Sequence, residues 1–199
     1  MHLLLVRHGQ SQWQVKGDLA GDDAPLTALG ESQAEYLGEY LAHSHSVDAI
    51  FTSPLRRARR TAEIVGKHLE MPVTVEPELC EFNYFGYDWA PPLPVSRWNL
   101  APEPSSLSSS YTTFRTRILA ILQTIVDAHL DDKTVLLVAH GGTLSVALRI
   151  LLGSDTPRMH LWNASLNHIE WGRRSNLGEG WTLHLVNQME HLPVLMRTV

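Results

Sequence analysis

The chain has 199 residues, of which 44% are hydrophobic and 19% are charged, and this length is sufficient to bury a core in one domain. Its formal net charge is only −5 and its sequence pI is about 6.1, so it lacks the basic field that would attract nucleic acid or an anionic membrane surface. The single cysteine cannot form an internal disulfide, no run reaches the roughly 18 apolar residues of a membrane span, and the histidines form no metal-binding pattern. Because the first apolar run begins at the start of this sequence without a basic segment before it, we expect no cleaved signal peptide. We therefore expect a cytoplasmic protein that binds a small molecule, with no metal and no cofactor.

The first apolar run is followed directly by groups that gain nothing from burial. Leu3 to Val6 are typical of a buried strand in a parallel sheet, and Arg7, His8 and Gly9 come immediately after them. Ligands of open α/β sheets bind at the carboxyl ends of the strands, where a glycine lets the backbone turn sharply. Taken alone, these residues favour the simpler interpretation of a strand that merely ends in polar side chains, and the rest of the chain reverses this preference.

A polar loop over residues 12–24 is expected next, followed by an amphipathic helix. Thr27 is the predicted N-cap of this helix, and apolar residues recur on one of its faces as far as Leu41. A short strand over 47–52 follows. We expect these elements to be structural.

The helix predicted from Pro54 to about Leu69, with Ser53 as its cap, carries an unusual charge pattern. Its first two turns, where the helix dipole disfavours each cation by roughly a few tenths of a kcal/mol, contain Arg56, Arg57, Arg59 and Arg60. We expect Arg56, Arg59 and Arg60 to be solvated. At least one arginine is expected to bind an anion, because helix amino ends bind phosphate and a guanidinium matches the phosphate oxygens.

A strand over 73–75 precedes a long segment without periodicity, from Pro77 to Tyr111. Such segments usually form lids or substrate loops. Glu81 stands between apolar neighbours near its start. Aromatic residues are dense over 82–98, and we expect about half of them to pack together and the others to line a pocket.

A second apolar run also ends in a histidine. After a helix predicted over 111–130, residues 134–139 are again typical of a central parallel strand, and His140 and two glycines follow them. If this strand is a neighbour of the first, His8 and His140 face one crevice at the carboxyl edge of the sheet.

The remaining elements are a helix over 143–152 and two alternating strands, over 165–171 and 180–186, which extend the sheet. Four histidines in this part of the chain have no motif around them, and we expect no catalytic role for them: His160, His168, His184 and His191.

The groups predicted at this edge of the sheet suit phosphoryl chemistry. Two imidazoles, Arg7 and a helix-end arginine would surround a doubly charged tetrahedral anion with positive charge. A glutamate nearby could protonate a leaving alkoxide, and one histidine could attack phosphorus to form a covalent intermediate. The protein itself then supplies the positive charge, and no metal is required.

Five blocks of the sequence resemble the histidine phosphatase superfamily, which has the phosphoglycerate mutase-like fold. They are Arg7-His8-Gly9, then Leu26-Thr27 with Gly30 and Gln33-Ala34, then Ser53-Pro54-Leu55-Arg56-Arg57-Ala58 with Thr61-Ala62, then Leu79-x-Glu81, and His140-Gly141-Gly142. The resemblance runs in order over about 1–192. It implies an α/β fold, a three-layer α/β/α sandwich with a mostly parallel central sheet. We expect a single domain over 1–199, in which only a substrate or lid excursion at about 82–113 lies outside the resemblance.

The resemblance also implies roles for individual residues. His8 would be the nucleophile that becomes phosphohistidine. Arg7 and Arg57 would hold the phosphate oxygens, and His140 would do the same as part of the catalytic group. Glu81 would protonate the leaving group and later activate water.

The chain departs from the family pattern at two places. Gln14 stands where many members have a phosphate-binding asparagine, and it carries the same amide on a longer arm. After Glu81 the family often has a compact glycine-containing turn that this chain lacks, which makes Asp88 the alternative acid.

The expected function is a metal-independent phosphomonoesterase of the histidine acid phosphatase type, acting on a small-molecule phosphomonoester. A mutase or bisphosphatase must hold a second anionic group, whereas the only basic residue between Phe82 and Phe114 is Arg97. A phosphoglycerate mutase is the alternative, and a weakly active phosphate-binding regulatory module is a second one. The sequence determines neither the substrate nor the oligomeric state.

Overall fold

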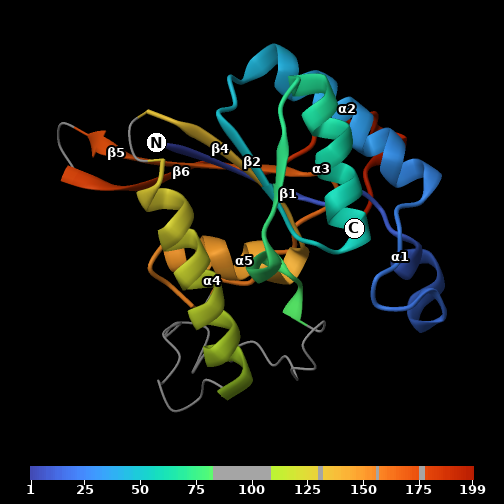
Figure 1. Ribbon diagram of the computed structural model, residues 1–199, viewed down its shortest axis with the longest axis horizontal. Helices are drawn as coiled ribbons and strands as arrows, with labels where there is room; N and C mark the ends of the chain where they lie inside the picture. Colours follow the sequence, from blue (N-terminus) through green and yellow to red (C-terminus); the bar gives the residue numbers. More distant parts are fainter. Residues whose placement is uncertain (83–108, 130–131, 156, 175–177) are drawn as a thin grey trace.

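A six-stranded sheet runs through the molecule in the order β3-β2-β4-β1-β5-β6 (Figure 1). The strands are β1 (His2–Arg7), β2 (Ala49–Thr52), β3 (Val73–Val75), β4 (Thr134–Ala139), β5 (Leu166–Arg174) and β6 (Gly178–Gln188). The first four strands pair in parallel, whereas β5 and β6 add antiparallel pairs beside β1. The computed structural model describes residues 1–82, 109–129, 132–155, 157–174 and 178–199.

Helices cover both faces of this sheet. They are α1 (Gln12–Lys16), α2 (Ala28–Ser44), α3 (Arg56–Leu69), α4 (Ser109–Asp127) and α5 (Gly141–Leu151), with short 3-10 turns at Gly17–Ala20, Pro77–Leu79 and Val194–Met196. Figure 1 shows α2 and α3 on one side of the sheet and α4 and α5 on the other. The predicted α/β/α sandwich with a mostly parallel sheet is therefore confirmed. No helix in the described parts of the chain is both long enough and apolar enough to cross a lipid bilayer.

The central strand β1 is held from both faces. Leu3 and Leu5 belong to the apolar cluster that includes α4 and α5, and Leu4 and Val6 belong to the cluster that includes α2 and α3. All four side chains are fully buried, which stabilises the fold by about 1.5–3 kcal/mol for each of them. A strand packed on both faces is an uninterrupted apolar run, and its end is a fixed point for the residues that follow.

A short helix occupies part of the loop predicted over 12–24. Ser11 and Gln14 form a capping box at the start of α1, in which each side chain bonds to the backbone of the other residue. The prediction of a loop is therefore wrong for this segment. A helix of only five residues is too short to show apolar periodicity in the sequence.

The predicted start of α3 is also wrong, by two residues. The helix begins at Arg56, and its N-cap is Leu55, which provides no side-chain cap. Ser53, the expected cap, is instead fully buried and bonds to His140. Ser53 therefore makes a tertiary contact in addition to a local one, since its Oγ also accepts the N–H of Leu55 at 3.3 Å.

The excursion expected at 82–113 is described only at its two ends. Phe82 is buried, and its ring centroid lies 4.8 Å from that of Phe114 in α4. The other aromatic residues of 82–98 and the alternative acid Asp88 lie outside the described residues.

Candidate active site

Strands β1 and β4 bring two histidines together. The strands are parallel neighbours, and the backbone N–H of His8 donates to the carbonyl oxygen of Ala139 at 3.0 Å. The imidazoles of His8 and His140, which follow the two strands, lie edge to face with their ring centroids 5.2 Å apart. The prediction that His8 and His140 lie close together required these two strands to be neighbours, and they are.

Two hydrogen bonds fix the protonation of His8. Its Nδ1 lies 2.7 Å from the carbonyl oxygen of Gly9, which can only accept, so Nδ1 carries the proton. Arg57 Nε donates to His8 Nε2 at 3.2 Å, so Nε2 holds a lone pair. Burial, reinforced by the charges of Arg57 and Arg7, holds the pKa of His8 well below its usual 6.5. The site thus contains a neutral imidazole with an unprotonated Nε2.

Arg57 turns into the molecule, while the other arginines at the start of α3 face solvent. Its Nη1 donates to the backbone oxygen of Asp22 at 2.7 Å. Burial lowers the pKa of Arg57, and the negative charge of Glu81 opposes this shift. By contrast, Arg59 and Arg60 are exposed and pair with Glu63 and Glu31 at 2.8 and 3.0 Å.

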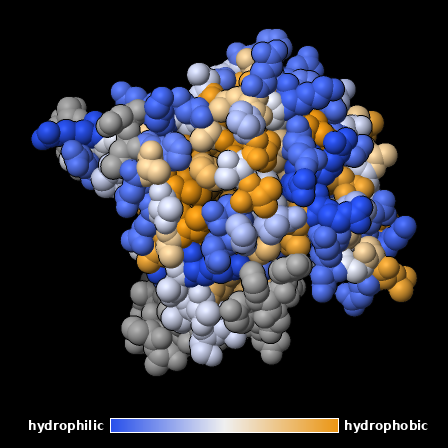
Figure 2. Space-filling model, in the orientation of Figure 1, coloured by the Kyte–Doolittle hydropathy of each residue, from blue (hydrophilic) through white to orange (hydrophobic). Residues whose placement is uncertain are grey.

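The outer side of α3 is accordingly hydrophilic (Figure 2). Arg56, Arg59 and Arg60 are all exposed, as expected from the sequence. Such exposed cations interact weakly with their partners because water screens them.

Arg7 lies on the other side of His8. Its Nη1 donates to the backbone oxygen of Leu161, and its Nε is buried without a partner among the residues described. Burial lowers the pKa of Arg7 to about 10, with the negative charge of Glu81 opposing and the positive charge of Arg57 adding to the shift. The guanidinium therefore stays charged near neutral pH and has N–H donors left for an anion.

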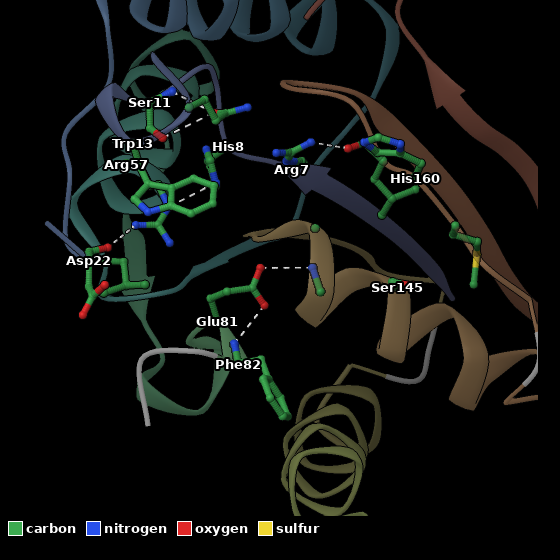
Figure 3. Close-up of a pocket in the computed structure, with 16 residues that line it drawn as sticks. Arg7, His8, Ser11, Trp13, Asp22, Arg57, Glu81, Phe82, Ser145 and His160 are labelled. Atoms are coloured by element: carbon green, nitrogen blue, oxygen red, sulfur yellow. Dashed lines mark hydrogen bonds between the residues drawn. The ribbon is translucent and has the colours of Figure 1, made fainter. Parts of the chain in front are cut away.

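Glu81 faces the first turn of α5 (Figure 3). Its Oε2 accepts the backbone N–H of Gly142 at 3.0 Å, and its Oε1 accepts those of Thr143 and Phe82 at 3.2 and 2.9 Å. A Cβ on Gly142 would lie 2.5 Å from Oε1, so the glycine leaves room for the carboxylate. The start of α5 thus fixes Glu81 across the site from His8.

His140 is completely buried and is the N-cap of α5. Its Nε2 lies 2.7 Å from Ser53 Oγ, and its Nδ1 is buried without a partner in the described part of the chain. Burial, with the charges of His8, Arg57, Arg7 and Arg117, holds the pKa of His140 well below 6.5. This imidazole is neutral as well.

A cavity of about 320 Å³ opens beside these groups, a size within the range of small-molecule sites. Arg7, His8, Arg57 and Glu81 line its polar part (Figure 3). Its apolar walls are Trp13, Leu55, Phe82, Met159 and Leu161. His140 is not among the residues that line the cavity, but its ring lies edge to face against that of His8, which does line it.

Comparison with known proteins identifies the family. The sequence matches the histidine phosphatase superfamily (branch 1) over residues 3–188. The chain belongs to this superfamily. It is 34% identical to "Uncharacterized phosphatase PhoE" of Bacillus subtilis (strain 168), over 94% of this chain and 95% of the relative. It is 28% identical to "Probable phosphoglycerate mutase GpmB" of Yersinia enterocolitica, over 96% of this chain and 95% of the relative. The solved structure of YhfR from Bacillus stearothermophilus has a TM-score of 0.72 at 23% identity, covering 96% of this chain and 98% of that one, which shows a shared fold.

In this member of the superfamily, Gln14 lines the cavity, but its amide bonds to the protein itself. Nε2 donates to Asn163 Oδ1 at 2.7 Å and to the backbone oxygen of Val199 at 2.6 Å, and Oε1 accepts the N–H of Ser11 at 2.9 Å. Both protons of Nε2 are used. A phosphate contact from Gln14 would first have to break one of these bonds.

Several cavity residues were not found from the sequence. Trp13, Asp22, Met159 and His160 line the site but belong to segments without a periodic pattern. Trp13 could have been recognised as a large aromatic residue in the polar segment after the first strand, and it is 45% exposed in the structure. The sequence around His160 contains no comparable signal.

Proposed function

We propose that this protein is a metal-independent phosphomonoesterase that works through a phosphohistidine on His8. The observation that carries this proposal is the environment of His8 Nε2, which is unprotonated and lies at the wall of a cavity beside Arg7 and Arg57. A nitrogen lone pair is a nucleophile, and guanidinium groups stabilise the charge on a transferring phosphoryl group.

In the first step, His8 Nε2 attacks phosphorus, and the bond from phosphorus to the ester oxygen breaks. Arg57 Nε, which donates to Nε2 at 3.2 Å in the free site, transfers its hydrogen bond to a phosphate oxygen as the N–P bond forms. Arg7 Nε supplies a second donor. Glu81, in its acid form, gives its proton to the leaving oxygen, so that a neutral alcohol departs.

In the second step, water attacks the phosphohistidine. The Glu81 carboxylate takes a proton from this water as the N–P bond breaks, which releases inorganic phosphate and returns His8 to its starting form. Glu81 thus ends the cycle with the proton that it gave up in the first step. The backbone donors at the start of α5 keep the carboxylate in place for both transfers.

The cavity walls favour a leaving group without a second anionic charge. Among the described lining residues, the arginines are Arg7 and Arg57, and both are beside His8 where the transferred phosphate binds. The remaining wall is mostly apolar or aromatic, and Asp22 adds a negative charge. A second phosphate or carboxylate on the substrate would find no guanidinium there.

Phosphate release from a panel of monoesters in EDTA tests the proposal. The panel should include p-nitrophenyl phosphate with sugar, nucleotide and alkyl phosphates. We expect turnover that EDTA does not reduce, an acid-labile phosphoryl group on the quenched enzyme, and loss of both in His8→Ala. Near-normal turnover in His8→Ala would refute the covalent mechanism, and absence of hydrolysis across the panel would refute the phosphatase.

A phosphoglycerate mutase is the second candidate, favoured by the 28% identity to a relative named as a mutase. Such a reaction must hold a second anionic group as well as the transferred phosphate. Stimulation by bisphosphoglycerate, with isomer formation faster than phosphate release, would favour this candidate over the hydrolase.

A further inference from the structure

Ser53 contacts His140 in the interior of the protein, and the His140 ring packs against that of His8, the proposed nucleophile. Ser53 is fully buried, and its Oγ lies 2.7 Å from His140 Nε2. The two residues follow β2 and β4, which are parallel neighbours, and the N–H of Ser53 donates to the carbonyl oxygen of Val138 at 3.1 Å. The register of the sheet therefore fixes the contact between the two side chains.

The partners of Ser53 Oγ favour the serine as the donor in this contact. Ser53 Oγ already accepts the N–H of Leu55 at 3.3 Å, and it has a single proton to donate. Its possible acceptors are His140 Nε2 at 2.7 Å and Cys80 Sγ at 4.0 Å. The imidazole nitrogen is closer, and a thiol sulfur is a weak acceptor, so the hydroxyl donates to Nε2.

The hydrogen bond at Nε2 determines the protonation of the other ring nitrogen of His140, Nδ1. A neutral imidazole that accepts at Nε2 must carry its proton on Nδ1. This Nδ1 is buried and has no partner among the described residues, and the His140 ring centroid is 5.2 Å from that of His8. His140 therefore presents an unused N–H donor next to the nucleophile.

We propose that Ser53 is a positioning residue that holds His140 in its Nδ1–H tautomer, so that His140 donates to an oxygen of the phosphoryl group carried by His8. The inference rests on the phosphotransfer proposed above and on the phosphate contact that the family resemblance implies for His140, and it adds the role of Ser53. His140 acts as a neutral hydrogen-bond donor, and the guanidinium groups of Arg7 and Arg57 supply the positive charge.

Nitrogen-15 NMR of the full-length protein tests the tautomer independently of turnover. Loss of signals in His140→Gln assigns the imidazole. We expect the His140 nitrogen shifts of the unaltered protein to show a protonated Nδ1 and an unprotonated Nε2. In Ser53→Ala we expect a mixture of tautomers or a protonated Nε2, and in Ser53→Thr, which keeps the hydroxyl, the original pattern. A proton on Nε2 in the unaltered protein would overturn the proposal.

Kinetics and phosphate binding test the consequence. We expect Ser53→Ala to lower kcat about 10- to 100-fold, as for other residues that orient a catalytic imidazole, and to weaken competitive inhibition by inorganic phosphate. Ser53→Thr should restore most of both. Cys80→Ala, which removes the other neighbour of the hydroxyl, should leave both within about twofold.

The outcomes separate the two proposals. Unchanged kcat and phosphate inhibition in a folded Ser53→Ala protein would refute the positioning role while leaving the phosphatase intact. If the unaltered protein hydrolysed nothing, the phosphatase would fail, whereas the NMR pattern would still decide the tautomer. If Ser53→Ala does not fold stably, Ser53→Thr tests the proposal. Loss of the Nδ1–H tautomer of His140 in Ser53→Thr would contradict it.

Discussion

Burial gives the individual side chains around His8 different charges near neutral pH. His8 is neutral because burial and two nearby guanidinium groups hold its pKa well below 6.5. Arg7 remains a cation, because burial lowers its pKa only to about 10. A neutral nucleophile between fixed cations is the arrangement that attack on a phosphate dianion requires.

Arg57 and Arg59 provide a matched pair for testing this arrangement. Both are arginines near the start of α3, but Arg57 is buried against His8 and Arg59 is exposed with Glu63. We expect Arg57→Ala to reduce kcat/KM on the order of 10²-fold or more, because a group that stabilises transferring charge is lost. Arg59→Ala should stay within about twofold. Equal losses in steady-state assays of the two variants would contradict the role of Arg57.

At the scale of an element, α5 positions Glu81, the proposed proton-transfer group. The N-terminus of a helix exposes backbone N–H groups without intrahelical partners, and Gly142 and Thr143 donate theirs to Glu81. Glu81 itself belongs to the segment after the 3-10 turn Pro77–Leu79. Its position therefore depends on the packing of two segments that are far apart in the sequence.

Gly142→Ala is expected to displace the Glu81 carboxylate, because the new Cβ would lie 2.5 Å from Oε1. Hydrolysis of alkyl phosphates should fall about 10-fold or more, whereas p-nitrophenyl phosphate, whose leaving group needs little protonation, should lose less. Gly180→Ala is the control, since a Cβ there meets nothing within 4 Å. Equal losses of kcat on both substrate classes would argue against Glu81 as the acid.

At the scale of the whole molecule, several histidines are held neutral by folding. Burial lowers the pKa of His168 to about 4, and the charges of His184, His2 and His45 add to this effect. Burial also lowers the pKa of His191 to about 4. The His168 and His184 rings are stacked with centroids 4.8 Å apart, so protonation would place like charges together.

This distribution predicts acid sensitivity. In the unfolded chain these histidines bind protons near the usual value of 6.5, whereas in the folded chain His168 and His191 do so only near 4. The unfolded state therefore binds more protons as pH falls from about 6.5 to 4, and the free energy of unfolding decreases over this window.

Urea unfolding at a series of pH values measures the effect. We expect His168→Gln to reduce the slope of unfolding free energy against pH between about 6.5 and 4.5, because one proton-linked group is removed. His43→Gln, which alters an exposed imidazole on α2, is the control and should keep the original slope. An unchanged slope in His168→Gln would contradict the assignment.

The sequence by itself determined the features that depend on local burial patterns. The uninterrupted apolar runs before His8 and His140 predict two buried parallel strands, because only strands covered on both faces lack alternating polar residues. The helical spacing of apolar residues from Leu55 predicts α3. The expectation that Arg56, Arg59 and Arg60 are solvated leaves Arg57 as the arginine that binds an anion, in agreement with the resemblance. These patterns, with the family blocks, were sufficient for the fold and for the carboxyl-edge location of the site.

Only the tertiary structure decided which side chains meet and through which atoms. Ser53 has the local pattern of a helix cap, yet it bonds to His140, which is 87 residues away in the chain. Gln14 has the amide of a phosphate ligand, yet both of its protons are bound by Asn163 and Val199. Local patterns report how much of a residue is buried, whereas a hydrogen bond between distant residues depends on strand register and helix packing. These are fixed only when the whole chain has assembled, because buried polar groups then bond to whichever partner the packing brings near.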